Sequence, residues 1–273
     1  MMIVRLFCPS CALEATKSLP HAVIDVPTPV AALSDDDRYE VRCQKGHVNI
    51  VFLNNLKFEL LFELGLNALV DGYPRESVSS FASALERFYE FYWHVFVAKV
   101  QLSEEEAANA WRALSKQSER QLGMYITAHT VLTKRCPLLL NPNTEVRFRN
   151  NVIHGGYVPN HQEAVNFGDK VMFLINSTLD DLRREVPEAV AAAHSRLLLR
   201  PSSGEDELIG SINVLTAVDV KCPPTQGDIR LGGVEAQFER ILRDRQPHGF
   251  ELLSKEEFEK KALSLGPSST DPG

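Results

Sequence analysis

The sequence predicts a mainly α protein: a helical bundle with a small β module on its N-terminal side and a small α/β appendage on its C-terminal side. Apolar residues recur at three- and four-residue spacing from Leu53 to about Leu199, which is the period of amphipathic helices. Before Leu53 the apolar runs are short and strand-like, and after the bundle residues 201–206 have the composition of a linker. We therefore expect three units, over residues 1–52, 53–200 and 201–273.

The composition is that of an ordinary globular chain, and it excludes several classes of protein. Hydrophobic residues make up 44% of the chain and charged residues 24%, far from disordered or fibrous compositions. The formal net charge of -7 argues against non-specific coating of nucleic acid, which needs many Lys and Arg side chains, although a local basic groove stays open. Since the chain has no run of about 18 apolar residues and no signal-peptide core, we expect a cytoplasmic protein without membrane contact.

Short strands are expected in the N-terminal fifty residues. Strand-like runs precede the first cysteine pair, precede Cys43 and follow His47. These runs cover residues 3–7, 39–42 and 48–52. The loop between the first two contains Pro and Asp, and residues 22–30 within it can add another strand.

Beyond the β module the chain predicts a succession of helices. The first ends where Gly72 can supply the left-handed residue that terminates a helix, and the second is long, with a wide aromatic face. Two later helices begin with capping boxes, Ser103 with Glu106 and Asn160 with Glu163. The expected helices cover residues 53–70, 75–100, 103–117, 120–133, 144–153, 160–185 and 187–199.

The C-terminal appendage has a weaker pattern. A β-like run covers residues 208–220, and a Pro-Pro turn follows it. An amphipathic helix is expected near residues 234–243, and a last helix after Ser254.

Four candidate metal ligands stand in two close pairs. Cys8 and Cys11 form a Cys-x-x-Cys pair, which lets two sulfur atoms converge on one ion, and Cys43 and His47 form the second pair, with Gly46 allowing a tight turn. The pairs are separated by 31 residues with strand-like flanks, as in a zinc ribbon. We expect one structural Zn²⁺, because four protein ligands leave no open position for catalysis and because the metal replaces a core that so short a segment cannot build.

Two other interpretations of the cysteines are weaker. A redox Cys-x-x-Cys pair is expected at the start of a helix in a βαβ unit, which the pattern lacks. Two unrelated cysteine clusters in a reducing compartment are the other alternative. Cys136 and Cys222 have no partners at ligand spacing, and we expect them to be buried apolar residues.

A second candidate site lies at the end of the short helix near residue 150. Asn150 and His154 are four residues apart and share a helix face, while Arg149 stands beside them. The negative end of the helix dipole favours a protonated imidazole, which suits proton transfer near neutral pH, and a guanidinium can bind a phosphate. Together these groups can cleave RNA without metal: the imidazole exchanges a proton with the 2′-hydroxyl or the leaving oxygen, and the guanidinium stabilises the phosphorane.

The motif Arg149-Asn150-x-x-x-His154 resembles the signature of HEPN domains, helical bundles common in toxin–antitoxin, abortive-infection and other antiviral systems. The resemblance covers roughly residues 53–199. It implies a metal-independent endoribonuclease that acts on RNA as a two-fold homodimer, with Arg149, Asn150 and His154 as its active residues. It also implies a supporting acid on the long helix, Glu86, and an antitoxin or another defence-system protein as a partner.

Other functional interpretations stay open. The bundle and the β module can form a non-catalytic interaction or sensor module in a larger complex, in which Arg149 and His154 make only a structural contact. A zinc-dependent nucleic-acid regulator is a third interpretation, which the negative net charge disfavours. Some HEPN toxins carry a nucleotidylated tyrosine in a His-x-Tyr motif; here Tyr157 stands one residue further on, so this mode of control is not carried over.

Overall fold

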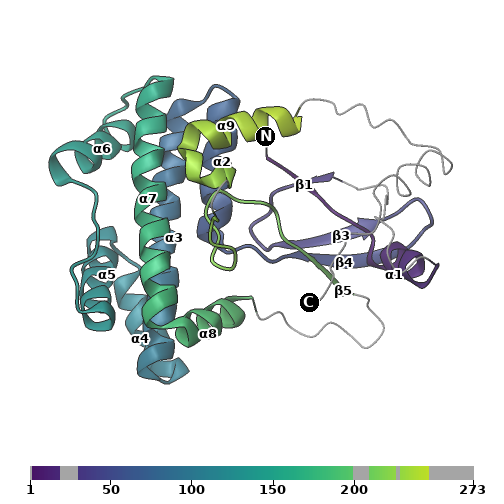
Figure 1. Cartoon of the computed structure of the whole chain (residues 1–273), viewed down its shortest axis with the longest axis horizontal. Helices are drawn as coiled ribbons and strands as arrows, with labels where there is room; N and C mark the ends of the chain where they lie inside the picture. The colour runs from purple at the N-terminus through teal and green to yellow at the C-terminus, as the bar shows by residue number, and fades with distance from the viewer. Residues whose placement is uncertain (1, 19–29, 199–208, 226–227, 246–273) are drawn as a thin grey trace, which may run out of the picture.

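The structure is a computed structural model, and it describes residues 2–18, 30–198, 209–225 and 228–245. Helices dominate it, and a smaller β part lies beside the helical bundle (Figure 1). The expectation of a mainly α protein with a small β part is therefore confirmed. Over the described ranges, no helix combines the length and the apolar character needed to cross a lipid bilayer.

The β part takes strands from two distant regions of the chain. β1 pairs antiparallel with β2, and β3 pairs antiparallel with β4. β5 lies parallel to β4 on its other edge, so the larger sheet has the order β3-β4-β5. The strands are β1 (Ile3–Arg5), β2 (Val30–Ala32), β3 (Arg38–Arg42), β4 (Val48–Leu53) and β5 (Ile209–Ile212).

The sequence predicts strands β3 and β4 but not helix α1 beside them. Both strands match the expected runs, and β1 is shorter than expected. Helix α1 (Pro9–Ser18) stands where no helix is predicted; Pro suits the first position of a helix, and Ala, Leu, Glu and Lys favour the turns that follow. The strand suggested for residues 22–30 lies outside the described residues, except for Val30 in β2.

The bundle consists of α2 to α8, and the seven predicted helices match them to within about four residues at each end. Both capping boxes form: the side chains of Ser103 and Asn160 accept hydrogen bonds from the backbone N–H groups of Glu106 and Glu163. A π-helical turn, Pro142–Val146, leads into α6. The helices are α2 (Lys57–Val70), α3 (Pro74–Val100), α4 (Glu104–Leu114), α5 (Ser118–Thr133), α6 (Arg147–Ile153), α7 (His161–Glu185) and α8 (Pro187–Leu197).

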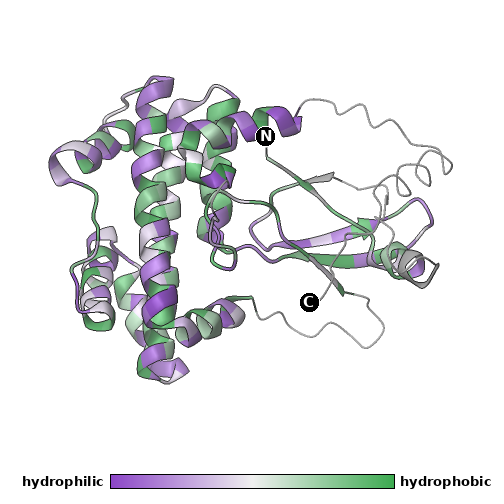
Figure 2. Ribbon diagram, viewed as in Figure 1, coloured by the Kyte–Doolittle hydropathy of each residue, from purple (hydrophilic) through white to green (hydrophobic). Residues whose placement is uncertain are grey.

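Helices α2, α3 and α7 meet around one aromatic ring. The ring of Phe81, on α3, is fully buried between Gly65 of α2 and Gly168 of α7. A Cβ atom at Gly65 would lie 2.7 Å from this ring, and one at Gly168 only 2.6 Å from it. Glycine therefore sets the distance at which these helices pack. Hydrophobic and hydrophilic bands alternate along α7, as expected of a helix with one face on the core (Figure 2).

The C-terminal segment contacts both other parts of the protein. Only Ile209–Ile212 of the β-like run forms a strand among the described residues, because backbone groups from Val214 onward bond to side chains of the bundle instead. A 3-10 turn, Ile229–Gly232, then leads into α9 (Gly233–Arg245), which packs on α2 and α7. The helix expected after Ser254 lies outside the described residues.

The two remaining cysteines correct an expectation. Cys136 and Cys222 are both exposed rather than buried. Each directly precedes a proline in an irregular segment, and such segments run over the protein surface because their backbone groups need water or other partners.

Candidate functional site

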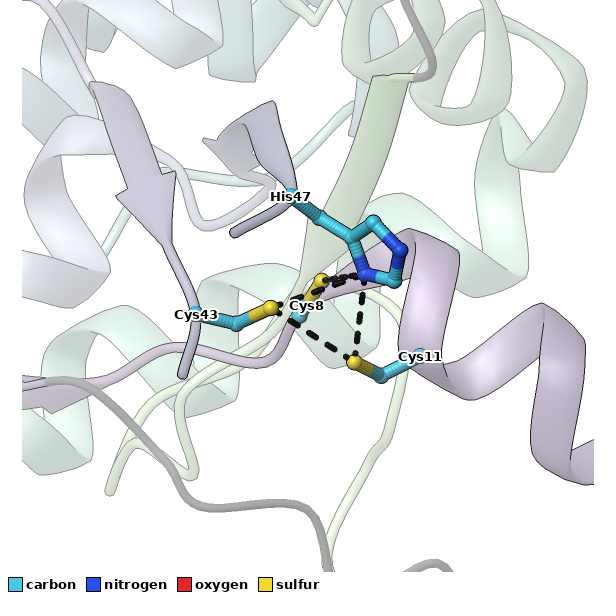
Figure 3. Close-up of side chains that lie close together, drawn as sticks. All are labelled: Cys8, Cys11, Cys43 and His47. Atoms are coloured by element: carbon cyan, nitrogen blue, oxygen red, sulfur yellow. Dashed lines mark hydrogen bonds between the residues drawn. The ribbon is translucent and has the colours of Figure 1, made fainter. Parts of the chain in front are cut away.

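Four ligands of the N-terminal module converge on one point. The sulfur atoms of Cys8, Cys11 and Cys43 and a nitrogen of His47 all lie within 4.8 Å of one another (Figure 3). Cys8 precedes α1 and Cys11 lies in its first turn, while the other two ligands flank the tight turn between β3 and β4. Gly46 has a φ of 82° in that turn, a left-handed conformation that glycine adopts without strain.

The distances between these atoms match a tetrahedral metal site. A tetrahedral ion with metal–sulfur bonds of about 2.3 Å and metal–nitrogen bonds of about 2.0 Å separates two sulfurs by about 3.8 Å and a sulfur from a nitrogen by about 3.5 Å. The Cys11 and Cys43 sulfurs lie 3.6 Å apart. The Nδ1 atom of His47 lies 3.8, 3.4 and 3.5 Å from the sulfurs of Cys8, Cys11 and Cys43. The four residues could therefore hold one metal ion.

Neighbouring polar groups orient the ligands. Nε2 of His47 lies 3.4 Å from a carboxylate oxygen of Glu14, an arrangement that places the proton on Nε2 and leaves the Nδ1 lone pair facing the sulfurs. The buried amide of Asn49 donates a hydrogen bond to the Cys8 sulfur at 3.2 Å. The hydroxyl of Ser10 in turn donates to the amide oxygen of Asn49 at 2.9 Å. Such outer partners are typical of a metal site.

The thiols require a cation nearby if all three are to ionise. Burial, and after it the adjacent sulfurs of Cys43 and Cys8, raise the pKa of Cys11 to about 12. Burial also opposes ionisation of Cys43, but backbone N–H groups of His47 and Lys45 outweigh it and lower the pKa of Cys43 to about 7. Three thiolates this close repel one another unless a positive ion lies between them.

The position of the Cys-x-x-Cys pair removes one argument against redox chemistry. Contrary to expectation the pair does stand at the start of a helix, where Ala12 N–H donates to the Cys8 carbonyl at 3.0 Å. However, a third sulfur and an imidazole lie in contact with this pair, which a simple redox pair does not need. The donor set therefore favours metal binding.

The second candidate site begins with an ion pair between α3 and α6. Arg149 Nη1 lies 3.7 Å from a carboxylate oxygen of Glu86, and both side chains are partly exposed. The site thus contains a contact between two residues that are 63 positions apart in the sequence. The fully buried side chain of Val152 anchors α6 on the bundle core.

His154 and Asn150 lie at the carbonyl end of α6. His154 follows the last helical residue, and its backbone N–H donates to the Asn150 carbonyl at 2.9 Å. Both side chains are exposed, and within the described residues neither has a hydrogen-bond or ion-pair partner. Gly156, with a φ of 71°, turns the chain away directly afterwards. The imidazole is therefore accessible beside the motif, as proton transfer to a bound substrate requires.

Tyr157, beside the motif, makes two contacts that the sequence does not predict. The Tyr157 hydroxyl donates to the Glu163 carboxylate, at 2.9 and 3.1 Å from its two oxygens, and this bond raises the pKa of Tyr157. The Tyr157 ring lies edge-on to Phe148 of α6, with centroids 6.4 Å apart. The sequence indicates only the capping role of Glu163. In the structure the same carboxylate also accepts the hydrogen bond from Tyr157.

The candidate residues thus form two separate groups: the four metal ligands, and Arg149 with Glu86, Asn150 and His154 where α3 meets α6. Comparison of the chain with protein-family models, with curated proteins and with solved structures gave no match.

Proposed function

We propose that the protein is a metal-independent endoribonuclease of the HEPN type, with Arg149, Asn150 and His154 as active residues and Glu86 as a positioning residue. The observation that carries the proposal is the arrangement at the end of α6. An accessible imidazole at the end of α6 follows, five residues along the chain, a guanidinium that is paired with a carboxylate of α3. A role in antiviral defence or growth arrest follows from the HEPN resemblance alone.

The proposed reaction is an acid–base transesterification. The 2′-oxygen of RNA attacks the adjacent phosphorus and loses its proton to a base, while the bond to the 5′-oxygen breaks and that oxygen gains a proton. His154 serves as one of the two proton-transfer groups. Arg149 stabilises the additional negative charge on the phosphorane, for which a guanidinium has five N–H donors in a planar fork. Asn150 orients groups around the imidazole.

The Glu86–Arg149 pair supports a positioning role. At 3.7 Å the contact is an ion pair longer than a direct hydrogen bond, and it engages Nη1 of the guanidinium. Other N–H groups of the fork are left for a phosphate. Because the pair is partly buried, it restricts the guanidinium more than two fully exposed side chains would.

The same ion pair favours a second candidate function, a non-catalytic interaction or sensor module. A carboxylate beside Arg149 neutralises its charge and opposes the approach of a phosphate. On this alternative the pair only fastens α6 to α3, and the protein acts through its partners.

We further propose that the metal is Zn²⁺ and that its role is structural. Three thiolates and one imidazole match the ligands that this ion prefers, and they fill all four positions of the tetrahedron.

The remaining proposals on partners rest on the resemblance: RNA as substrate, a homodimer that joins two motifs, and an antitoxin or another defence-system protein. Apolar side chains are exposed near the motif and on α7, including Val158 and Phe173.

The decisive experiment incubates the purified full chain with total cellular RNA in EDTA. The wild type should cleave RNA, whereas His154→Ala and Arg149→Ala should each lose at least about 100-fold in rate, the usual contribution of a proton-transfer group and of a charge-stabilising donor respectively. His161→Ala is a matched control, because His161 is also an exposed histidine and lies on the neighbouring helix. Circular dichroism and zinc content, measured before and after incubation, verify folding. Absence of cleavage by a folded, zinc-loaded wild type would favour the interaction module.

A further inference from the structure

Strand β5, which lies far from the four candidate ligands in the sequence, completes the β part that carries them; we call this part the metal module. β5 pairs in parallel with β4, the strand that starts directly after the ligand His47. Asn54, just past β4, donates its backbone N–H to the Ile212 carbonyl at 2.8 Å and so extends the pairing. Ile212 and Val214 also pack on the small apolar core that contains Cys8 and Cys11. The module therefore consists of the N-terminal segment and residues 209–214.

Gly210 of β5 lies close to the segment that carries Cys8 and Cys11. A Cβ atom at this position would lie 2.5 Å from Cγ of Pro9, which stands between the ligands Cys8 and Cys11 in the chain. The same atom would lie 3.3 Å from the ring of Phe7. Gly210 is thus required by a close approach of two chain segments, and any displacement of one segment is felt by the other.

The chain after β5 is fastened to the bundle by polar side chains spaced four residues apart along α2 and just beyond its two ends. We name these five residues, 55, 59, 63, 67 and 71, the α2 polar stripe. Four of them are buried, and each bonds to the C-terminal segment. The pairs are Asn55 with Val214, Glu59 with Val220, Glu63 with Arg240, and both Asn67 and Asp71 with Arg245.

Asn55 is the residue of the α2 polar stripe that bonds next to β5. Its amide donates to the Val214 carbonyl at 2.9 Å and its amide oxygen accepts from the Val214 N–H at 2.7 Å. This two-way pairing reproduces the hydrogen bonds of a strand neighbour, and it begins two residues after β5 ends. The strand is therefore held at one end by α2 and along its length by β4.

We propose that metal binding and the docking of residues 209–214 are thermodynamically coupled: the ion fixes the start of α1 against β5, and docked β5 in turn raises the affinity for the ion. The proposal rests on the metal site of the proposed function. Coupling of this kind is reciprocal, because a ligand that stabilises one docked state is bound more tightly by that state. The C-terminal segment is thereby a positioning element of the metal site, although it supplies no ligand.

The first test measures zinc affinity by competition with a chromophoric chelator, for full-length wild type, Gly210→Ala and Gly123→Ala. The methyl group at 210 meets Pro9, whereas at Gly123, on the surface of α5, it meets nothing within 4 Å. Gly210→Ala should weaken zinc binding by about 5- to 150-fold, the range of a packing conflict transmitted through coupled sites. Gly123→Ala should match the wild type. Equal affinity for all three proteins would overturn the proposal.

A second variant guards against general misfolding of the first. Asn55→Ala removes the two bonds to Val214 and alters neither a metal ligand nor the contact of Gly210 with Pro9, and it too should weaken zinc binding. In hydrogen exchange, zinc removal from the wild type should expose the amides of residues 209–212 while α9 stays protected. Unchanged protection of this strand would overturn the coupling. Failure of the wild type to take up zinc would instead refute the metal site itself, so the two failures are distinguishable.

Discussion

Burial of Glu59 in the α2 polar stripe predicts that the protein loses stability as pH rises. The side chain is 3% exposed, and its two oxygens accept backbone N–H bonds from Val220 at 2.8 Å and from Leu56 at 2.9 Å. Burial raises the pKa of this carboxyl from 4.5 to about 7, although those two N–H groups work in the opposite direction and nearby Asp219 adds to the rise. The folded protein therefore binds a proton that the unfolded chain has already released.

The sign and size of the pH effect on stability follow from this difference in proton binding between the folded and unfolded chain. A carboxyl with a raised folded pKa stabilises the fold fully below pH 4.5, and this contribution is lost as pH rises through about 7. At about 1.4 kcal/mol per pKa unit, the loss is about 3 kcal/mol. Other groups titrate in the same range, so the quantity to compare is the change in unfolding free energy between pH 5 and pH 8 in matched variants.

Urea denaturation of Glu59→Gln should show a pH dependence smaller than that of the wild type by about 2.5 kcal/mol over this range, the part of the full effect that falls between pH 5 and pH 8. The amide is neutral at both pH values and retains one acceptor oxygen, so it abolishes the titration while keeping the size of the side chain. Glu105→Gln changes an exposed glutamate of α4 in the same way and should retain the wild-type dependence. If the unfolding free energies of the wild type and of Glu59→Gln changed equally between pH 5 and pH 8, the reasoning would be refuted.

Three further predictions concern packing, the ion pair and the metal. Gly168→Ala should destabilise the protein by about 1–3 kcal/mol, because its methyl group meets the buried ring of Phe81. Gly123→Ala should stabilise it by about 0.5–1 kcal/mol, because alanine favours a helix and its methyl group meets nothing within 4 Å. Chemical denaturation measures both. Glu86→Gln should slow RNA cleavage about tenfold by releasing Arg149, with less than about 1 kcal/mol lost in stability; faster cleavage would mean that the carboxylate shields the guanidinium. Cys43→Ser should lose most of its zinc by mass spectrometry while the helical circular dichroism persists; full zinc content would argue against this ligand.

The helices are predictable from sequence because their signals are local. Periodic apolar residues, a Gly at the first helix end and two capping boxes each act within a few residues, and the structure contains all of them. The four candidate metal ligands are predictable for the same reason, since each pair is closed by one short segment. Helix α1 is missed because its ten residues include one large aliphatic side chain, Leu13, so no apolar period marks the helix beyond its start at Pro9.

What the sequence does not predict depends on contacts between distant residues. The four-residue spacing of Asn55, Glu59 and Glu63 at the start of a mainly apolar helix is visible in the sequence, but their partners lie more than 150 positions away. Likewise nothing local assigns β5 to the N-terminal sheet. Family resemblance suggested Glu86 as a supporting acid, but its ion pair with Arg149 was not predicted, because no periodicity relates residues on different helices.

Placement of β5 in the N-terminal sheet also sets an order of folding during synthesis. Asn55 and Val214 are 159 positions apart, so the strand that completes the first-made module is among the last described parts to leave the ribosome. Closing so long a loop is entropically costly and slow compared with forming the helices between its ends. The bundle can therefore assemble while the first fifty residues still lack a sheet neighbour. Until residue 212 arrives, the edge of β4 is unpaired, and a nascent chain at this stage is the one most exposed to misassembly and to chaperones.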